Sequence, residues 1–116
     1  MFIMNYKNGR SYNLSLSLPY KVHGHALIEY DDEIYVFGGR GDYKTFYKNM
    51  YKLNRFMTWQ KMANLIVKRY GITNSSVVLN GFIWAIGGRD GPKDLKSVEK
   101  YDPATNTWTK MPLVLF

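Results

Sequence analysis

Residues 82–91 read FIWAIGGRDG, and residues 33–42, which lie 49 positions earlier (82 − 33 = 49), read EIYVFGGRGD. In both stretches a run of apolar, aromatic and β-branched residues meets two glycines and then an arginine. This pattern is typical of a β-strand that ends at a sharp turn, because glycine accepts backbone angles that other residues avoid. The recurrence predicts two copies of one structural unit.

The same offset relates further identical residues, whereas chance would give about two identities over this length. Besides the pairs Gly38-Gly39 and Gly87-Gly88, the matches are Ile34 with Ile83, Arg40 with Arg89, Lys44 with Lys93, Thr58 with Thr107, Trp59 with Trp108, Lys61 with Lys110 and Met62 with Met111. So many matches at one spacing indicate a true internal repeat.

Each unit is predicted to form four short antiparallel strands, because apolar runs alternate with Gly, Pro, Asp and Asn. Asn80-Gly81 predicts a two-residue hairpin, since both residues tolerate a positive φ. Residues Tyr12 to Leu18 are interpreted as a strand left from a preceding unit. The expected strands cover residues 25–30, 33–37, 47–53 and 58–62 in the first unit, and 72–79, 82–86, 97–101 and 107–111 in the second. The predicted fold class is all-β.

The composition limits the function classes. A hydrophobic share of 46% with 22% charged residues excludes a disordered chain. The absence of cysteine excludes disulfides, cysteine-ligated zinc and a thiol nucleophile, and it favours a cytoplasmic location. The apolar run at residues 1–4 ends at Asn5, too early for a signal peptide or a membrane span. We therefore expect no membrane association.

These residues resemble the Kelch repeat, a unit of about 50 residues that forms one blade of a β-propeller. The second unit carries FIWAIGGRDG, then SVEKYDP at residues 97–103, then Trp108, and it is similar to the Kelch-like subgroup. The first unit is looser, since it keeps residues 34–40 and Trp59 but has no Tyr-Asp-Pro. The resemblance covers residues 11–116 and implies two four-stranded antiparallel Kelch blades of an incomplete β-propeller, plus a strand from a preceding blade.

The resemblance divides the chain into an N-terminal segment with part of a preceding blade (1–22), a first Kelch repeat (23–71) and a second (72–116). It also implies structural duties for the motif residues. Glycine permits a close approach of backbone between blades, and a buried tryptophan anchors the outer strand of its blade. The residues with these expected duties are Gly38, Gly39, Trp59, Gly87, Gly88, Tyr101 and Trp108.

In Kelch-like adaptors the loops after the second strand and between blades hold a substrate peptide. The resemblance therefore implies a protein-interaction module, similar to the substrate-binding part of cullin-based ubiquitin-ligase adaptors or to actin-associated Kelch proteins. Arginine suits such a surface because its fork pairs with carboxylates, although Arg40 and Arg89 could instead brace their own turns. The candidate partner-binding residues are Arg40, Tyr43, Lys44, Arg69, Tyr70, Arg89 and Lys93.

Two other functions remain open. Propellers close with about four to eight blades, so two blades suggest a fragment, a truncated product of a degraded gene, or a subunit that completes its propeller by self-association. Of these we favour the truncated product, which could be a non-functional remnant. The net charge of +7 would also suit nucleic acid or an anionic surface, but the basic residues form no dense stripe.

No constellation of residues supports catalysis, a metal or a cofactor. His23 and His25 share one side of an expected strand, yet no third histidine exists and nearby Glu29 shows no obvious convergence. The cluster Asp31, Asp32 and Glu33 is interpreted as one solvated turn. The chain is therefore expected not to be an enzyme.

Overall fold

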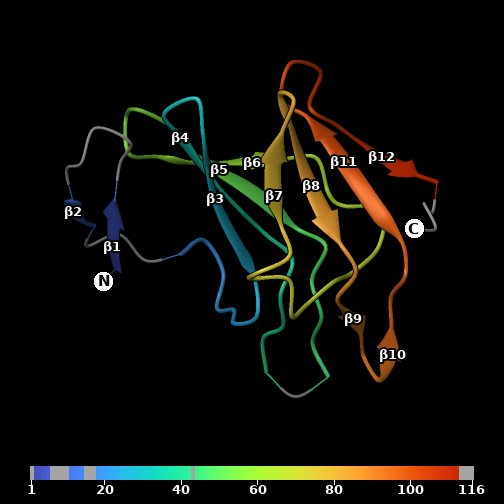
Figure 1. The fold of residues 1–116 in the computed structure, drawn as a ribbon. Coiled ribbons are helices and arrows are strands. Elements are labelled where there is room, and N and C mark those ends of the chain that lie inside the picture. Colours follow the sequence, from blue (N-terminus) through green and yellow to red (C-terminus); the bar gives the residue numbers. More distant parts are fainter. Residues whose placement is uncertain (1, 6–10, 15–17, 43, 113–116) are drawn as a thin grey trace.

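The computed structural model describes residues 2–5, 11–14, 18–42 and 44–112, and its architecture is all-β. Two four-stranded antiparallel sheets, here called blade 1 and blade 2, pack against each other (Figure 1). In order across the sheet, blade 1 consists of β3 (Ala26–Tyr30), β4 (Glu33–Phe37), β5 (Met50–Leu53) and β6 (Trp59–Met62). Blade 2 consists of β12 (Thr107–Met111), β11 (Val98–Asp102), β8 (Phe82–Ile86) and β7 (Val77–Leu79). The predicted pair of four-stranded antiparallel sheets is confirmed.

The first hairpin of each blade closes through two residues in the left-handed region. Asn80 and Gly81 have φ values of 55° and 81°, and Asp31 and Asp32 have values of 53° and 63°. This backbone twist matches the right-handed twist of the flanking strands, which explains why two such different dipeptides make the same connection. The hairpin predicted at Asn80-Gly81 is confirmed.

Several expected boundaries were wrong. The strand expected over 72–79 shortens to β7, because residues 72–76 turn: the Ser75 amide and the Ser76 hydroxyl both donate to the Ile72 carbonyl. The strand expected over 47–53 shortens to β5. A small hairpin of β9 (Arg89–Asp90) and β10 (Lys93–Asp94) stands where a loop was expected.

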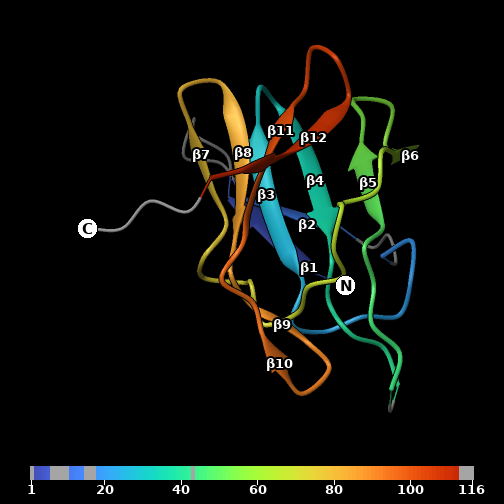
Figure 2. The same ribbon diagram turned by 90° about the vertical axis from the view of Figure 1, so that its right-hand side faces the viewer.

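The strand expected over residues 12–18 also differs from the prediction. Strand β2 (Ser11–Leu14) pairs with β1 (Phe2–Asn5) in a separate two-stranded sheet, and residues 15–17 lie outside the described part of the chain. Figures 1 and 2 both place this sheet on the far side of blade 1 from blade 2. It is thus one half of a local hairpin and not a lone strand.

The hydrophobic core lies between the two blades. Tyr35 and Phe37 of β4 point toward blade 2, where they meet Tyr101 and Trp108 with ring centroids 5.9 Å and 5.3 Å apart. Each of these aromatic side chains can bury about 150 to 250 Å², so they dominate the stability of the junction. The other core residues are Ala26, Met50, Leu65, Ile72, Ile83 and Ala85.

Glycine is required where the backbone of the connecting segment crosses the blade ends. A Cβ on Gly38 would lie 2.6 Å from the Arg69 carbonyl oxygen, and a Cβ on Gly88 would lie 2.7 Å from the Tyr70 carbonyl oxygen. Both glycines also have positive φ values. The repeated glycine pair therefore permits the close contact between the segment joining the blades and the long loops that follow β4 and β8.

The tight turns and the long loops lie at opposite ends of the blades (Figures 1 and 2). The first two strands of each blade are joined at one end, here called the hairpin end, by residues 31–32 and 80–81. The loops after β4 (38–49) and β8 (87–97) lie at the other end, here called the loop end, together with residues 68–72 of the segment joining the blades. The candidate binding residues come from this loop end.

Candidate functional site

An arginine stacked on two aromatic rings joins the loops of both blades. Phe46, from the loop after β4, stacks on Tyr70, from the joining segment, with ring centroids 5.2 Å apart and planes inclined by 25°. The guanidinium carbon of Arg40 lies 5.4 Å from the centroid of the Tyr70 ring and 5.9 Å from that of Phe46. These distances suit cation–π attraction, so the cluster holds a positive charge at the junction of the loops.

Tyr70 ties this cluster to blade 2. Its amide donates to the carbonyl of Arg89 at 3.0 Å, and its carbonyl accepts the amide of Arg89 at 2.9 Å. Its hydroxyl donates to the Gly91 carbonyl at 3.0 Å. Tyr70 therefore spans the gap between the two long loops and fixes their spacing.

The charge of Arg40 forms no ion pair with another residue that the structure describes. Among the described residues, no carboxylate lies within ion-pair distance of the half-buried Arg40, and its Nε is buried without a hydrogen-bond partner. Its backbone is held in place by two hydrogen bonds of 2.8 Å with His23. An arginine fixed in this way presents its terminal nitrogens to a carboxylate at little conformational cost.

The other candidate residues of the loops are placed differently. Arg89 is exposed and pairs with Asp94 at 3.2 Å, and it also donates to the Pro92 carbonyl, so it braces its own hairpin. Lys93 and Lys44 are exposed on the loops of blade 2 and blade 1. Tyr43 lies outside the described residues.

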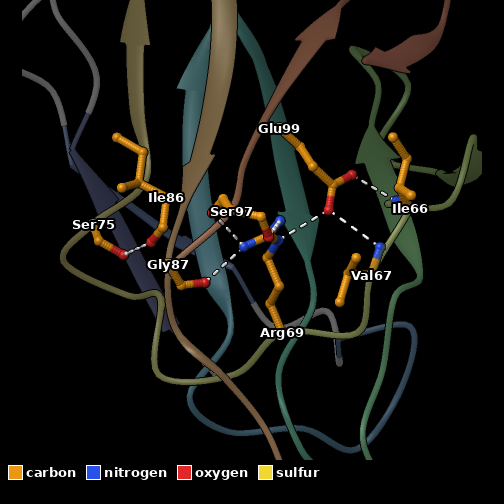
Figure 3. A network of polar contacts seen from close by, with 8 residues as sticks. All are labelled: Ile66, Val67, Arg69, Ser75, Ile86, Gly87, Ser97 and Glu99. Carbon is orange, nitrogen blue, oxygen red and sulfur yellow. Dashed lines mark hydrogen bonds and ion pairs between the residues drawn. The ribbon is translucent and has the colours of Figure 1, made fainter. Parts of the chain in front are cut away.

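Arg69 requires a correction, because the expected contact residue is fully buried. Its Nε pairs with Glu99 Oε2 at 2.9 Å, one Nη donates to the carbonyls of Gly87 and Ser97, and the other donates to the Ser97 hydroxyl (Figure 3). The guanidinium thus points into the junction between blades and away from any partner. An arginine that looks like a loop residue in the sequence is part of the internal frame.

Glu99 completes this frame and was missed by sequence reasoning. Its two carboxylate oxygens accept the amides of Ile66 and Val67 at 2.6 Å and 3.2 Å, and it is buried (Figure 3). The signal was available: in a strand, Glu99 shares a face with Tyr101, and this alternation places the carboxylate on the core side of the sheet. A buried carboxylate needs a cation, and Arg69 supplies it.

In the first repeat, two tyrosines occupy the positions that correspond to the buried ion pair of Arg69 and Glu99. Tyr20 precedes Arg69 by 49 positions (69 − 20 = 49), and its hydroxyl donates to the Gly38 carbonyl at 2.7 Å, as Arg69 does to Gly87. The Tyr20 ring packs on Tyr51 with centroids 5.4 Å apart. Burial and the neighbouring tyrosines raise the pKa of Tyr20. The ion pair of one repeat is therefore replaced by an aromatic pair in the other.

The two ends of the blades carry opposite charge. At the loop end, the acidic residues are outnumbered by basic ones that are at least partly accessible. The basic residues are Arg40, Lys44, Lys48, Lys68, Arg89, Lys93 and Lys96, and the acidic residues are Asp42, Asp90 and Asp94. At the hairpin end lie Asp31, Asp32, Glu33 and Asp102, against Lys52 and Arg55. The loop end therefore attracts negatively charged groups.

Among the residues that the structure describes, no group of three or more His, Cys, Asp or Glu side chains is positioned to hold a metal ion, and the two histidines belong to no such group. Burial, with a smaller effect of His23, lowers the pKa of His25. The His25 Nδ1 is buried without a partner. Within the described ranges, no helix has the length and apolar character needed to cross a membrane.

Comparison with known proteins identifies the repeat. Residues 74–112 match the family model of the Kelch motif. The chain is 39% identical over 77 residues to Kelch-like protein 35 of Mus musculus and 33% identical over 94 residues to Kelch-like protein 40 of Xenopus laevis. It is also 33% identical over 117 aligned positions to the F-box/kelch-repeat protein At2g29600 of Arabidopsis thaliana, an alignment that covers 98% of the chain.

The fold agrees with these relatives. The solved structure of YjhT, a Kelch β-propeller, superposes with a TM-score of 0.62 at 23% sequence identity, over 80% of this chain and 28% of that one. The alignments with the two Kelch-like proteins cover 66% and 78% of this chain but only 12% and 15% of the relatives. That with the Arabidopsis protein covers 28% of its length. The chain therefore spans between 12% and 28% of the length of each of these proteins.

Proposed function

We propose that this chain, which carries Kelch repeats, is a protein-interaction module that binds an acidic segment of a partner protein at its loop end. The observation that carries the proposal is the Arg40 guanidinium, held over Phe46 and Tyr70 with no carboxylate partner among the described residues. A rigid aromatic platform with an unpaired arginine is the type of feature that dominates binding energy at protein interfaces.

The surrounding loops support the same function. Arg89 and Lys93 stand on the β9–β10 hairpin, which Tyr70 links to the Arg40 cluster. Their charge would steer an acidic segment toward the loop end, and the acidic hairpin end would repel it. The partner would be a substrate peptide of a ubiquitin-ligase adaptor or a segment of a cytoskeletal protein, as the resemblance implies. We further propose that the chain acts in the cytoplasm and has no catalytic activity.

Affinity capture from cell lysate, read by quantitative mass spectrometry, tests this function. We expect Arg40→Ala and Tyr70→Ala to reduce capture of specific partners by about tenfold or more, the typical loss at a dominant contact. Arg55→Ala is the matched control, because Arg55 is an exposed arginine at the hairpin end. Equal capture by wild type and Arg40→Ala, or equal loss with Arg55→Ala, would contradict the proposal.

The positive loop end also favours a second candidate, the binding of nucleic acid. In that case a single-stranded oligonucleotide would bind with an affinity that falls steeply with salt, since counterions are released from the phosphates. A titration at low salt that shows no oligonucleotide binding would exclude this candidate and leave the protein partner.

A further inference from the structure

An open groove of about 460 Å³ lies at the loop end, between the segment joining the blades and blade 2. Val67 of that segment and Ser97, from the loop after β8, both line it. Three lysines from β10, the same loop and β12 are also part of the lining, and the groove is here called the lysine groove. They are Lys93, Lys96 and Lys110. The groove is therefore a feature of the junction between the two blades.

The buried ion pair of Arg69 and Glu99 holds this lining in place. Glu99 accepts the amide of Val67 at 3.2 Å, and Arg69 donates to the carbonyl and the hydroxyl of Ser97 at 2.9 Å and 2.8 Å (Figure 3). In the register of the sheet, Lys110 stands opposite Glu99 on the neighbouring strand. The backbone of the groove is thus fixed before a ligand arrives, which lowers the ordering cost of binding.

The lining carries a net positive charge. Its three lysines are exposed, and among the residues that the structure describes none of their side chains takes part in an ion pair. Of the two aspartates in the lining, Asp94 is already paired with Arg89 at 3.2 Å. Three positive charges against the one negative charge of Asp90 leave +2. The groove therefore attracts a negatively charged ligand.

A phosphoryl group matches this lining better than a carboxylate does. A phosphorylated side chain carries a charge of about −1.5 to −2 at pH 7, whereas a carboxylate carries a single negative charge. The lining offers ammonium groups on flexible stems and no guanidinium, so it lacks the planar fork that pairs with the two oxygens of a carboxylate. Three separate point charges suit a group whose charge is spread over several oxygens.

We infer that the lysine groove binds a phosphoserine or phosphothreonine of the same partner segment whose carboxylate contacts Arg40, an inference that rests on the proposed function. Tyr70, which stacks with Arg40, pairs with Arg89 of β9, and β9 pairs with β10. Neighbouring chains lie about 4.8 Å apart, so β10 is about 10 Å from Tyr70, and an extended residue spans about 3.3 Å. The carboxylate and the phosphoryl group are therefore expected about three to five residues apart.

Fluorescence anisotropy of labelled synthetic peptides, titrated with the full chain at low salt, tests the inference. Each peptide carries one glutamate and one phosphoserine in an otherwise uncharged sequence, at spacings inside and outside the expected range. Matched peptides carry serine, or a second glutamate, in place of phosphoserine. We expect phosphoserine to strengthen binding over serine by about five- to tenfold within that range, because three exposed ion pairs of about twofold each act together. Outside the range, and with the second glutamate, the gain should be less than about threefold.

Single substitutions of lysine locate the phosphoryl group. Lys96→Met and Lys110→Met should each lower the affinity for the phosphoserine peptide by about two- to fivefold and leave that for the serine peptide unchanged. Lys100→Met is the matched control. Lys100 stands next to Glu99 on β11 and therefore points to the other face of the sheet, where its Nζ lies 4.3 Å from the centroid of the Phe82 ring. This control should leave the affinities for both peptides unchanged.

Three results would overturn the inference: equal affinities for the phosphoserine and serine peptides, an equal affinity when a second glutamate replaces phosphoserine, or an equal loss in Lys100→Met. Binding of a single-stranded oligonucleotide, but of no peptide, that weakens in Lys96→Met and Lys110→Met would also contradict it. Arg40→Ala separates the inference from the proposed function. If this variant weakens binding of every peptide while phosphorylation adds nothing, the proposed function stands and only the inference fails. If it changes no affinity, the proposed function itself fails.

Discussion

Replacement of Arg69 by methionine should cost this protein a large part of its stability. The substitution removes the ion pair with Glu99 and three further hydrogen bonds, to the Gly87 carbonyl, the Ser97 carbonyl and the Ser97 hydroxyl. It leaves the Glu99 carboxylate buried, with only the amides of Ile66 and Val67 as donors. Removing one partner of a buried ion pair costs about 3 to 5 kcal/mol, against a total of about 5 to 15 kcal/mol for an ordinary domain.

The first repeat suggests a pair of substitutions that should restore part of the stability lost when the Arg69–Glu99 ion pair is broken. In the variant that combines Arg69→Tyr with Glu99→Tyr, the pair would imitate Tyr20 and Tyr51, and no unpaired charge would remain in the junction. We expect this double variant to be more stable than either single variant by at least about 1 kcal/mol, because partners in one network couple by about 0.5 to 3 kcal/mol.

Urea unfolding, followed by tryptophan fluorescence, measures both effects, since Trp108 is only 7% exposed and packs against Phe37. Arg55→Met serves as the control for loss of an exposed arginine, and it should change the free energy of unfolding by less than about 0.5 kcal/mol. The reasoning would be refuted if Arg69→Met lowered the free energy of unfolding by less than about 1 kcal/mol. It would also be refuted if the double variant lost as much free energy of unfolding as Arg69→Tyr and Glu99→Tyr lose together.

Three further predictions concern single positions. Gly88→Ala should lower the melting temperature by several degrees more than Gly71→Ala, because a Cβ at Gly88 would lie 2.7 Å from the Tyr70 carbonyl oxygen whereas a Cβ at Gly71 would meet no atom within 4 Å. Both glycines have positive φ, so equal shifts of the melting temperature by calorimetry would refute this explanation. Burial lowers the pKa of His25, so this residue binds a proton more readily in the unfolded chain, and the free energy of unfolding should fall as pH drops below about 6.5. His25→Gln should flatten that part of the pH profile measured by urea unfolding, and an unchanged slope would contradict the prediction. Burial, with smaller effects of Asp102 and Glu33, raises the pKa of Tyr101 to about 12, so the free energy of unfolding should also fall as pH rises above about 10. Tyr101→Phe should reduce this alkaline loss, and it should cost about 1 kcal/mol at neutral pH because the hydrogen bond to Asn106 is removed. An alkaline profile of urea unfolding identical to that of the wild type would count against the assignment.

The loop end shows which surroundings of the candidate binding residues the sequence could not indicate. Arg40 and Tyr70 were both candidate binding residues, and in the structure the Arg40 guanidinium carbon lies 5.4 Å from the centroid of the Tyr70 ring. Phe46, which completes the cluster, was not expected, because no periodic pattern marks a side chain in an irregular loop. Arg69 was expected beside them and is instead buried, since neighbours along a loop can point in opposite directions.

The sequence by itself determined the architecture of the repeat. Alternation of apolar residues, the glycine pairs and the Asn80-Gly81 turn are local signals, and they specify strands and hairpins through backbone sterics and burial alone. The recurrence at 49 positions then predicted two equivalent sheets, which the structure contains.

Only the tertiary structure decided which charges face inward and which face of each sheet is covered. Arg69 and Glu99 are separated by 30 residues, and nothing local joins them until the blades pack. The same holds for the face of blade 2 that is turned away from blade 1: its residues correspond to those that blade 1 buries, but their exposure depends on whether a neighbouring sheet is present. Long-range contacts are properties of the packed chain, so the roles of these residues became visible only in three dimensions.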